Sequence, residues 1–234
     1  MPLCRRVQPE LLDHLSPDDP AALRSRADLR RLNLVLGNFR WFAAGLAGPL
    51  RASPPPSMVE IGAGDGSLGR YLLRRCPGLV FTGLDLVPPP PDWPCELEWE
   101  QGDVFEALPR LDPAIVIANH FLHHFATPDL RRLGAILTAS KVQLLLANEP
   151  ARSRYTQTLA LFAPLLGLNH VTLSDMRTSI EAGFQGDELP AALFPEDARG
   201  AWNIHCFASP AGACRLIARR HPSRIGEYFR ALPE

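Results

Sequence analysis

The stretch MVEIGAGDGSLGRYLL at residues 58–73 contains four glycines within eight residues, between an apolar run and a segment with helical character. A glycine-rich turn between a strand and a helix lets a ligand approach the backbone closely and presents free N–H groups to it. The apolar run ends at Ile61, so the turn begins at Gly62. The stretch therefore predicts a strand, a ligand-binding turn and a helix, in that order.

The glycine turn matches two overlapping patterns. Residues 64–69 satisfy GxGxxG, the dinucleotide fingerprint, whereas residues 60–66 satisfy an acid-x-GxGxG pattern. In the frame that starts at Gly62, Ser67 stands where the dinucleotide fingerprint requires glycine. The carboxylate of Glu60, one residue before the strand end, would repel a pyrophosphate but suits an ammonium group. This frame therefore favours an amino-acid-like, cationic ligand.

After this turn the chain alternates between apolar runs and helical segments, which predicts right-handed crossovers and a mostly parallel sheet. A final pair of strands joined by Ser-Pro-Ala-Gly indicates a hairpin and hence an antiparallel strand. The predicted strands are residues 57–61, 79–86, 97–104, 114–119 and 142–149, and the predicted helices between them are 67–76 and 129–140.

The predicted organisation is a single domain, residues 1–234. A helix over residues 17–48, with Ser16 as its cap, is followed by a proline-rich linker at 51–57. Two further helical pieces are predicted at 153–166 and 174–183. The parts are an N-terminal helical extension (1–50), a ligand-binding core (57–149), a helical lid (150–195) and a terminal hairpin (202–220).

Composition narrows the class of protein. The net charge of −1 gives no electrostatic reason to expect a nucleic acid or an anionic membrane as partner. Five scattered cysteines without a CxxC pair indicate reduced thiols. The start of the chain lacks the apolar core of a signal peptide, and the most apolar later run, residues 158–168, is interrupted by Pro164. We therefore expect a soluble, cytoplasmic protein.

Polar residues follow three further strands at the edge where parallel sheets bind ligands. Asp85 ends the second strand, 19 residues after Gly66, where an acid can accept both hydroxyls of a ribose. Asp103 follows the third strand and can accept an adenine amino group, with Val104 packing on the adenine face. Asn119 ends the fourth strand beside the same cleft.

The order VEIGAGDGSLG, GLDL, QGDVFE and IVIANHFLHHF resembles a class I S-adenosylmethionine-dependent methyltransferase over residues 58–149. DLRRLNLVLGNFRWF, residues 28–42, is similar to the leader of a group of small bacterial methyltransferases acting on small molecules. The resemblance implies an α/β, Rossmann-like, seven-stranded, mostly parallel sheet with an antiparallel last strand, and S-adenosylmethionine as cofactor with S-adenosylhomocysteine as product. It implies these cofactor-binding residues: Glu60, Gly62, Ala63, Gly64, Gly66, Asp85, Leu86, Asp103, Val104 and Asn119.

The segment NHFLHHF, residues 119–125, lies on the expected acceptor side. Its three histidines have near-neutral pKa values as free side chains, and we predict His123 or His124 as a general base, although LHHF is also a packing motif. His120, Tyr155 and Arg177 are the predicted substrate-binding residues. The histidines lack a third, acidic ligand at a fixed helical spacing, so no metal site is predicted.

The predicted function is transfer of a methyl group from S-adenosylmethionine to a small-molecule acceptor, with oxygen favoured over nitrogen or carbon. Two alternatives stay open: an NAD(P)-dependent oxidoreductase that uses the overlapping GxGxxG, and a non-catalytic partner protein that binds S-adenosylmethionine. An RNA or protein acceptor also stays open. The amino-methylating signature Asn/Asp-Pro-Pro-aromatic is absent, because His120 and Phe121 occupy the two proline positions. The sequence leaves the oligomeric state open.

Overall fold

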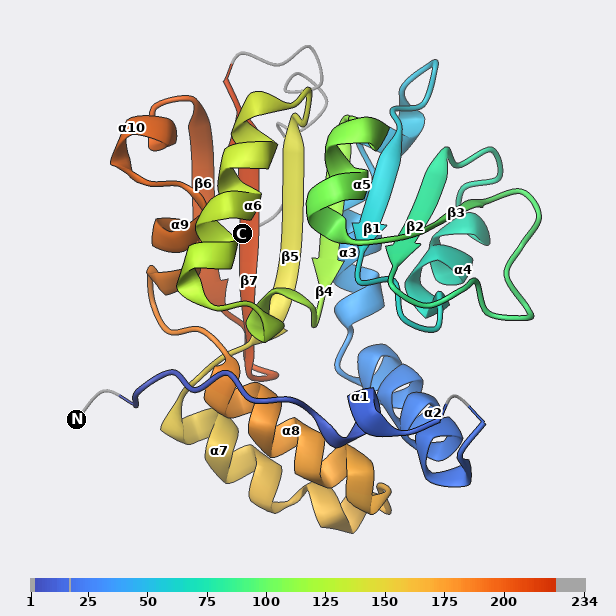
Figure 1. Cartoon of the computed structure of the whole chain (residues 1–234), viewed down its shortest axis with the longest axis vertical. Helices are drawn as coiled ribbons and strands as arrows, with labels where there is room; N and C mark the ends of the chain where they lie inside the picture. The colour runs from blue at the N-terminus through green and yellow to red at the C-terminus, as the bar shows by residue number, and fades with distance from the viewer. Residues whose placement is uncertain (1–2, 17, 222–234) are drawn as a thin grey trace.

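The computed structural model describes residues 3–16 and 18–221. A seven-stranded sheet in the order β3-β2-β1-β4-β5-β7-β6 forms its centre (Figure 1). Strands β1 to β5 pair in parallel, and β7 is antiparallel to both β5 and β6, which confirms the predicted mostly parallel sheet with an antiparallel last strand. The strands are β1 Met58–Ile61, β2 Phe81–Asp85, β3 Glu98–Gln101, β4 Ile115–Asn119, β5 Leu144–Pro150, β6 Trp202–Ala208 and β7 Ala213–Arg220.

The strand order places the glycine turn at the topological switch point. The chain leaves β1 for β2 and β3 on one side, then returns to β4 on the other side of β1. Ligands of such sheets bind where the order reverses, outside the carboxyl ends of the strands. The glycine turn after β1 and the histidine segment after β4 therefore lie side by side at this edge, with Gly62 against the Phe121 ring.

Helices cover both faces of the sheet (Figure 1). On one face, α3 (Asn38–Leu46) and α4 (Ser67–Leu73) pack through Phe39, Phe42 and Leu72 onto β1, β4 and β5. On the other face, α5 (Val104–Leu111), α6 (Thr127–Ala139) and α9 (Glu188–Leu193) bury their leucines against the same strands. Two continuous apolar layers thus hold the carboxyl ends of the strands at fixed relative heights.

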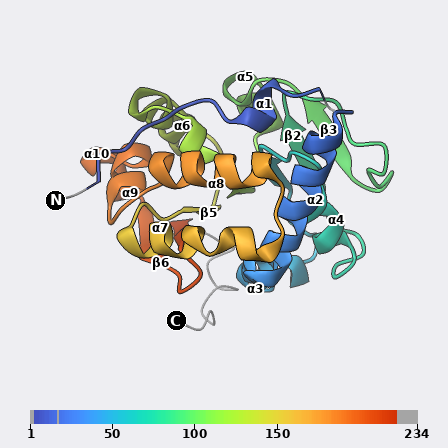
Figure 2. The same ribbon diagram turned by 90° about the horizontal axis from the view of Figure 1, so that it is seen from below.

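A helical cover lies over the carboxyl ends of the strands. Viewed from below, α8 (His170–Ala182) lies between α7 and the N-terminal helices (Figure 2). It contacts α1 (Leu11–His14), α2 (Pro20–Val35) and α7 (Arg154–Leu161), so the N-terminal extension and the lid form one layer. The short 3-10 helices are η1 Pro49–Arg51, η2 Leu122–His124 and η3 Ala163–Leu166. Within the described residues, no helix combines the length and apolarity that crossing a bilayer requires.

Several element boundaries differ from the sequence prediction. The N-terminal helix begins at Pro20 with Asp19 as its cap, not at Ser16, because the Asp19 side chain accepts the N–H groups of Ala21 and Ala22. Gly37, with φ of 72°, then divides the helix into α2 and α3.

Four helices were not predicted, and several predicted elements were too long or too short. The third strand ends at Gln101 because Asp103 caps α5. Helix α8 begins at His170, four residues before the predicted start, with Asn169 as its cap. The helices missing from the prediction are α1, α5, α9 and α10 (Glu196–Arg199).

The contact between α6 and α9 yields a stability prediction. A Cβ on Gly134 would lie 1.8 Å from the backbone oxygen of Leu193, which cannot move as a flexible side chain can. We expect Gly134→Ala to lower the free energy of unfolding by about 1–3 kcal/mol, despite the better helix propensity of alanine. The measurement is chemical denaturation followed by circular dichroism.

The matched control is Gly200→Ala. A Cβ on Gly200 meets nothing within 4 Å, and its φ of −59° suits any residue. This variant should unfold at the parent midpoint. Equal midpoints for the two variants would contradict the packing argument.

Candidate active site

The three turn glycines lie in the left-handed region, with φ of 67° at Gly62, 57° at Gly64 and 68° at Gly66. Two of them make room for rings of the protein itself. A Cβ on Gly62 would lie 2.0 Å from the Phe121 ring, and one on Gly66 would lie 2.5 Å from the Trp93 ring. A Cβ on Gly64 meets nothing within 4 Å. Gly64 is therefore the turn glycine whose backbone faces open space, where a ligand can approach.

Glu60 lies buried beneath this turn, with 3% of its surface exposed. Its Oε2 atom has no hydrogen-bond partner. Burial, followed by the charges of Asp65 and Asp85, raises the pKa of Glu60 well above its usual range. An orphaned buried carboxylate is unfavourable, and a cationic group such as an ammonium would relieve it. The residues of the turn thus fit a ligand with an amino group.

Asp85, at the end of β2, holds the glycine turn from the side. Its Oδ2 accepts the Gly64 N–H at 2.7 Å, and its Oδ1 accepts the Val87 N–H at 3.2 Å. Each carboxylate oxygen keeps a second acceptor position, so ribose hydroxyls can still bind there. Leu86, the next residue, is 70% exposed and offers an apolar surface beside that position.

Of the two residues predicted to bind the adenine, the structure leaves Asp103 available but buries Val104. Asp103 caps α5 by accepting the Phe105 N–H at 2.7 Å, so this carboxylate has a structural role and an oxygen to spare. Val104 is only 6% exposed and packs into the core with Ala107 and Leu108, so it is not an open surface for a base. Ala63, within the turn, is also buried.

A lateral row of residues links the glycine turn to the far strands. Asn119 on β4 pairs in register with Asn148 on β5, and Asn148 pairs with Arg215 on β7. Because Ile61 pairs with Ala118, the next position on the β1 side of this row is Gly62. The row therefore runs along the carboxyl edge from the turn to β7.

Four asparagines connect this row to the N-terminal helices; we call Asn33, Asn38, Asn119 and Asn148 the asparagine network. Asn148 Nδ2 donates to Asn119 Oδ1 at 3.1 Å, and Asn119 Nδ2 donates to Asn33 Oδ1 at 3.2 Å. Asn38 Nδ2 donates to the same Asn33 oxygen at 3.1 Å. Asn38 and Asn148 are buried, so each bond also removes the cost of an unpaired amide.

His120 is held by this network. Its Nε2 lies 3.3 Å from the side-chain nitrogens of both Asn38 and Asn148, which can only donate, so Nε2 is the acceptor and the ring is neutral. Burial lowers the pKa of His120 to about 4, in agreement with a neutral ring. His120 also has φ of 55°, an uncommon conformation for a non-glycine residue that is frequent at functional sites.

His123 is buried between two carboxylates, which does not suit the predicted general base. Its Nδ1 lies 2.8 Å from Glu149 Oε2 and its Nε2 lies 3.3 Å from Glu10 Oε1. Although burial opposes the charge, the hydrogen bonds that the ring donates to both carboxylates raise the pKa of His123 to about 9. A ring that is protonated at neutral pH has no lone pair to accept a proton. The geometry assigns His123 a bracing role.

Unlike His123, His124 has a neutral ring that can accept a proton. Its ring lies 4.3 Å from the His123 ring, and burial together with that positive charge lowers its pKa, so the ring is neutral at neutral pH. In the described residues, Glu10, His123 and His124 form the one cluster of three possible metal ligands, with donor atoms within 4.8 Å of one another. Both His123 nitrogens already contact carboxylates there, and the absence of a metal stays a prediction.

Tyr155 lies on α7 and Arg177 on α8, and neither forms a hydrogen bond or an ion pair with the histidine segment in the described residues. The hydroxyl of Tyr155 donates to the backbone oxygen of Pro210 at 2.9 Å, and the Tyr155 side chain is 56% exposed. Arg177 is exposed on α8. Neither bonds to the asparagine network in the described structure, so their predicted substrate contacts stay predictions.

Several residues of the site were not predicted from the sequence. Arg30 on α2 forms an ion pair of 2.6 Å with Asp65 in the glycine turn. Asn33 and Asn38 lie in the leader motif but were not singled out. Arg215 carries no local signal beyond strand alternation, because its neighbours come from β5 and α3, far away in sequence.

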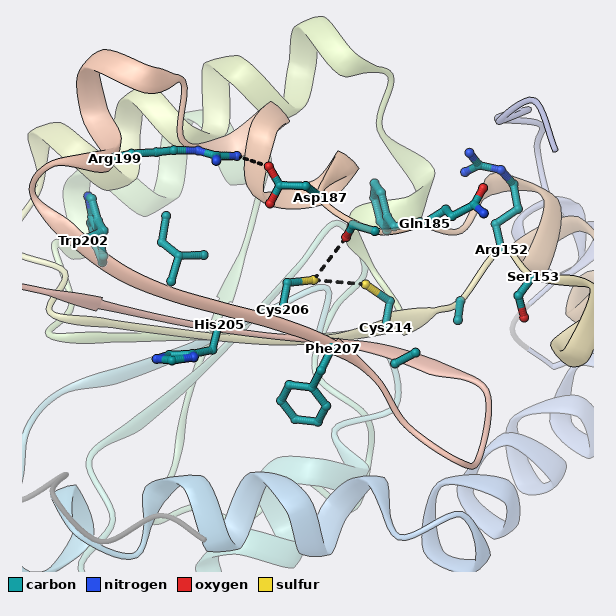
Figure 3. Close-up of a pocket in the computed structure, with 15 residues that line it drawn as sticks. Arg152, Ser153, Gln185, Asp187, Arg199, Trp202, His205, Cys206, Phe207 and Cys214 are labelled. Carbon is teal, nitrogen blue, oxygen red and sulfur yellow. Dashed lines mark hydrogen bonds and ion pairs between the residues drawn. The ribbon is translucent and has the colours of Figure 1, made fainter. Parts of the chain in front are cut away.

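A separate cavity of about 670 Å³ lies against β6, at the opposite edge of the sheet (Figure 3). Figure 3 shows Cys206 and Cys214 within it, with their sulfurs 3.5 Å apart as free thiols. Strands β4, β5 and β7 lie between β1 and this cavity, so it is distinct from the glycine turn.

The strand order, the antiparallel β7 and the glycine turn at the switch point define the fold of the class I S-adenosylmethionine-dependent methyltransferases. A solved structure with this fold is the plantazolicin methyltransferase BpumL in complex with SAH. It has a TM-score of 0.64 and 12% identity, over 87% of this chain and 91% of that one. An O-methyltransferase family protein from Burkholderia thailandensis has a TM-score of 0.53 and 18% identity, over 87% of this chain and 60% of its own.

Matches in sequence cover a smaller part of the chain than matches in structure. No model of a protein family matches the chain. The trans-aconitate 2-methyltransferase of Mycobacterium tuberculosis is 37% identical over 68 residues, 28% of this chain and 26% of that protein. The chain thus matches about a quarter of the length of these curated relatives.

The orphaned carboxylate of Glu60 yields a pH-dependent prediction. Because the folded pKa is raised above the ordinary 4.5, the protonated form stabilises the fold below pH 4.5, and this stability is lost as the pH rises through the folded pKa. Glu60→Gln removes this loss. We expect the variant to be more stable than the parent at pH 8, by about 1–3 kcal/mol, and the difference to shrink at pH 5.

Thermal unfolding at pH 5 and pH 8 provides the measurement. Glu98→Gln, at an exposed position on β3, is the control with the same change of charge and should follow the parent at both pH values. A stability difference for Glu60→Gln that is the same at both pH values would mean that the folded pKa is not raised.

Proposed function

We propose that this chain transfers a methyl group from S-adenosylmethionine to a small-molecule acceptor, most readily to an oxygen atom. The observation that carries this proposal is the orphaned Glu60 carboxylate beneath a glycine turn that is open at Gly64. This turn lies at the switch point of a methyltransferase fold. A dinucleotide would bring a pyrophosphate to the turn and leave the Glu60 carboxylate without a partner.

The cofactor would bind along the carboxyl edge of β1, β2 and β3. The ammonium group of its methionine part would pair with Glu60, with the turn backbone at Gly64 beside it. Asp85 would accept the ribose hydroxyls, and Asp103 the adenine amino group, with Leu86 covering the base. When bound, the cofactor supplies a sulfonium methyl group that a nucleophile can displace.

The acceptor would lie on the side of β4 and β5, against His120 and the asparagine network. Methyl transfer depends chiefly on holding the nucleophile in line with the methyl group and the sulfur, which a rigid polar wall can do. His120 would donate from its Nδ1–H, because its Nε2 accepts bonds from Asn38 and Asn148. Where the acceptor carries a proton of high pKa, the neutral His124 is the candidate base.

The relatives support a small acceptor by their names, which are those of methyltransferases acting on trans-aconitate and plantazolicin. Among the described residues, the wall of the proposed acceptor side is built from amides, a neutral histidine and one arginine, whereas nucleic-acid binding relies on many basic side chains. Five free cysteines suit a reducing compartment, and we place the reaction in the cytoplasm.

Calorimetric titration with S-adenosylhomocysteine, S-adenosylmethionine and NADH in parallel tests the cofactor. We expect the two adenosyl ligands to bind. Asp85→Asn should weaken this binding about tenfold or more, because a carboxylate hydrogen bond contributes roughly 1.5–3 kcal/mol. Asp92→Asn is the matched control, since Asp92 is exposed and pairs with Arg70 outside the turn. It should bind both ligands as the parent does.

The other outcomes distinguish the alternatives. Binding of NADH alone would mean that the turn serves the dinucleotide frame and that the chain is an oxidoreductase. Binding of S-adenosylmethionine without methyl loss over a broad panel of acceptors would indicate a non-catalytic partner protein. Binding of none of the three would overturn the proposal.

A further inference from the structure

Arg215 carries a charge that no acidic side chain neutralises among residues 3–16 and 18–221. Its Nε donates to Asn148 Oδ1 at 3.2 Å and its Nη2 donates to Asn38 Oδ1 at 3.3 Å, so both partners are neutral amides. No carboxylate of the described residues lies within ion-pair distance of it. Burial lowers the pKa of Arg215, and no acidic group offsets that effect. A half-buried guanidinium is normally paired with an anion.

The guanidinium is fixed in place and still has donors to offer. It lies over the Trp41 ring, 5.1 Å from the ring centre, and its hydrogen bonds to the two asparagine side chains hold one of its edges. Of the five N–H groups of an arginine, these bonds use two. The remaining donors form a planar fork that matches the two oxygens of a carboxylate.

The position of Arg215 connects it to the methyl-transfer site. It belongs to the row that runs from Gly62 through Asn119 and Asn148, three strands away from the turn. Neighbouring strands are about 4.8 Å apart, so β7 lies about 14 Å from β1 along this row. The Arg215 side chain bonds to Asn148 on β5 and to Asn38 on α3, and both of these amides also contact His120, which directly follows β4. A small molecule can span this interval.

We propose that Arg215 anchors a carboxylate group of the methyl acceptor, so that the enzyme acts on a small organic acid. This inference rests on the proposed function and names its class of substrate. One arginine framed by neutral amides matches a monoanionic, planar group. A phosphate dianion would call for a second cation, and the other groups bonded to the asparagine network are amides, the backbone and a neutral histidine.

The asparagine network orients the guanidinium group of Arg215. Each amide in the chain from Asn148 to Asn119 to Asn33 presents its oxygen toward the arginine side and its nitrogen toward the next residue. Aligned hydrogen bonds of this kind polarise one another, and their oxygen ends hold the guanidinium without cancelling its charge. The anchor is therefore positioned and positive before an acid binds.

The test measures carboxylate binding to protein saturated with S-adenosylhomocysteine. The probes are trans-aconitate, citrate, 4-hydroxybenzoate and acetate up to 10 mM, with trimethyl trans-aconitate and methyl 4-hydroxybenzoate as uncharged counterparts. We expect one or more acids to bind while the matching ester binds at least tenfold more weakly. Arg215→Gln should weaken acid binding at least tenfold, whereas Arg215→Lys should retain part of it.

The matched control variant is Arg40→Gln, on the exposed side of the helix that carries Asn38 and Trp41. It changes the net charge by the same amount and should bind the acids as the parent does. Each variant is first titrated with S-adenosylhomocysteine, which also shows that it is folded. If the parent does not bind this ligand, the proposed function fails, and not only the inference about the acceptor.

Three results would overturn the inference with the proposed function intact. The first is that S-adenosylhomocysteine binds but none of the acids does. The second is that acids bind equally to the parent and to Arg215→Gln. The third is that Arg215→Gln weakens S-adenosylhomocysteine itself at least tenfold, which would assign the arginine to the cofactor carboxylate.

Discussion

The buried carboxylate of Glu149 holds the segment on which the candidate site depends. It is fully buried at the end of β5, and it accepts the backbone N–H groups of Phe121, Leu122 and His123 as well as the His123 ring. These bonds fix the chain as it leaves β4. They place Phe121 against Gly62 in the glycine turn, and they orient the preceding His120 toward the asparagine network. Glu10 extends the same contact to the N-terminal segment through His123.

Two ionisable groups of the site, one acidic and one basic, lack a partner of opposite charge among the described residues. Glu60, beneath the glycine turn, lacks a partner for one buried oxygen, and Arg215, at the far end of the row, bonds only to amides and an aromatic ring. Proteins rarely leave such groups unpaired, because burial of an unpaired charge is costly. A cationic amino group at one end and an acidic acceptor at the other would complete both.

The sequence predicted the core of the fold well because the signals there are local. An apolar run followed by glycines specifies β1 and its turn, and alternating elements of this kind can form only a parallel sheet with short crossovers. The prediction was weaker where a helix-capping residue determines the end of an element. Asp103 begins a helix instead of extending a strand, and Asp19 takes the cap that Ser16 was expected to provide. A capping residue and a ligand-binding acid look alike in a sequence, and a three-dimensional contact separates them.

Glu60, the glycine turn and Asp85 were determined by the sequence itself, because their spacing relative to two strand ends sets where they lie. The states of the histidines were decided only by the tertiary structure. His123 is charged and His120 is neutral, although both come from one seven-residue segment, because one lies between two carboxylates and the other accepts from two amides. The partners come from α1, α3 and β5, so no local pattern could reveal them. The same reason hid Arg215, because its partners in the described structure, Asn38 and Asn148, lie far from it in the sequence.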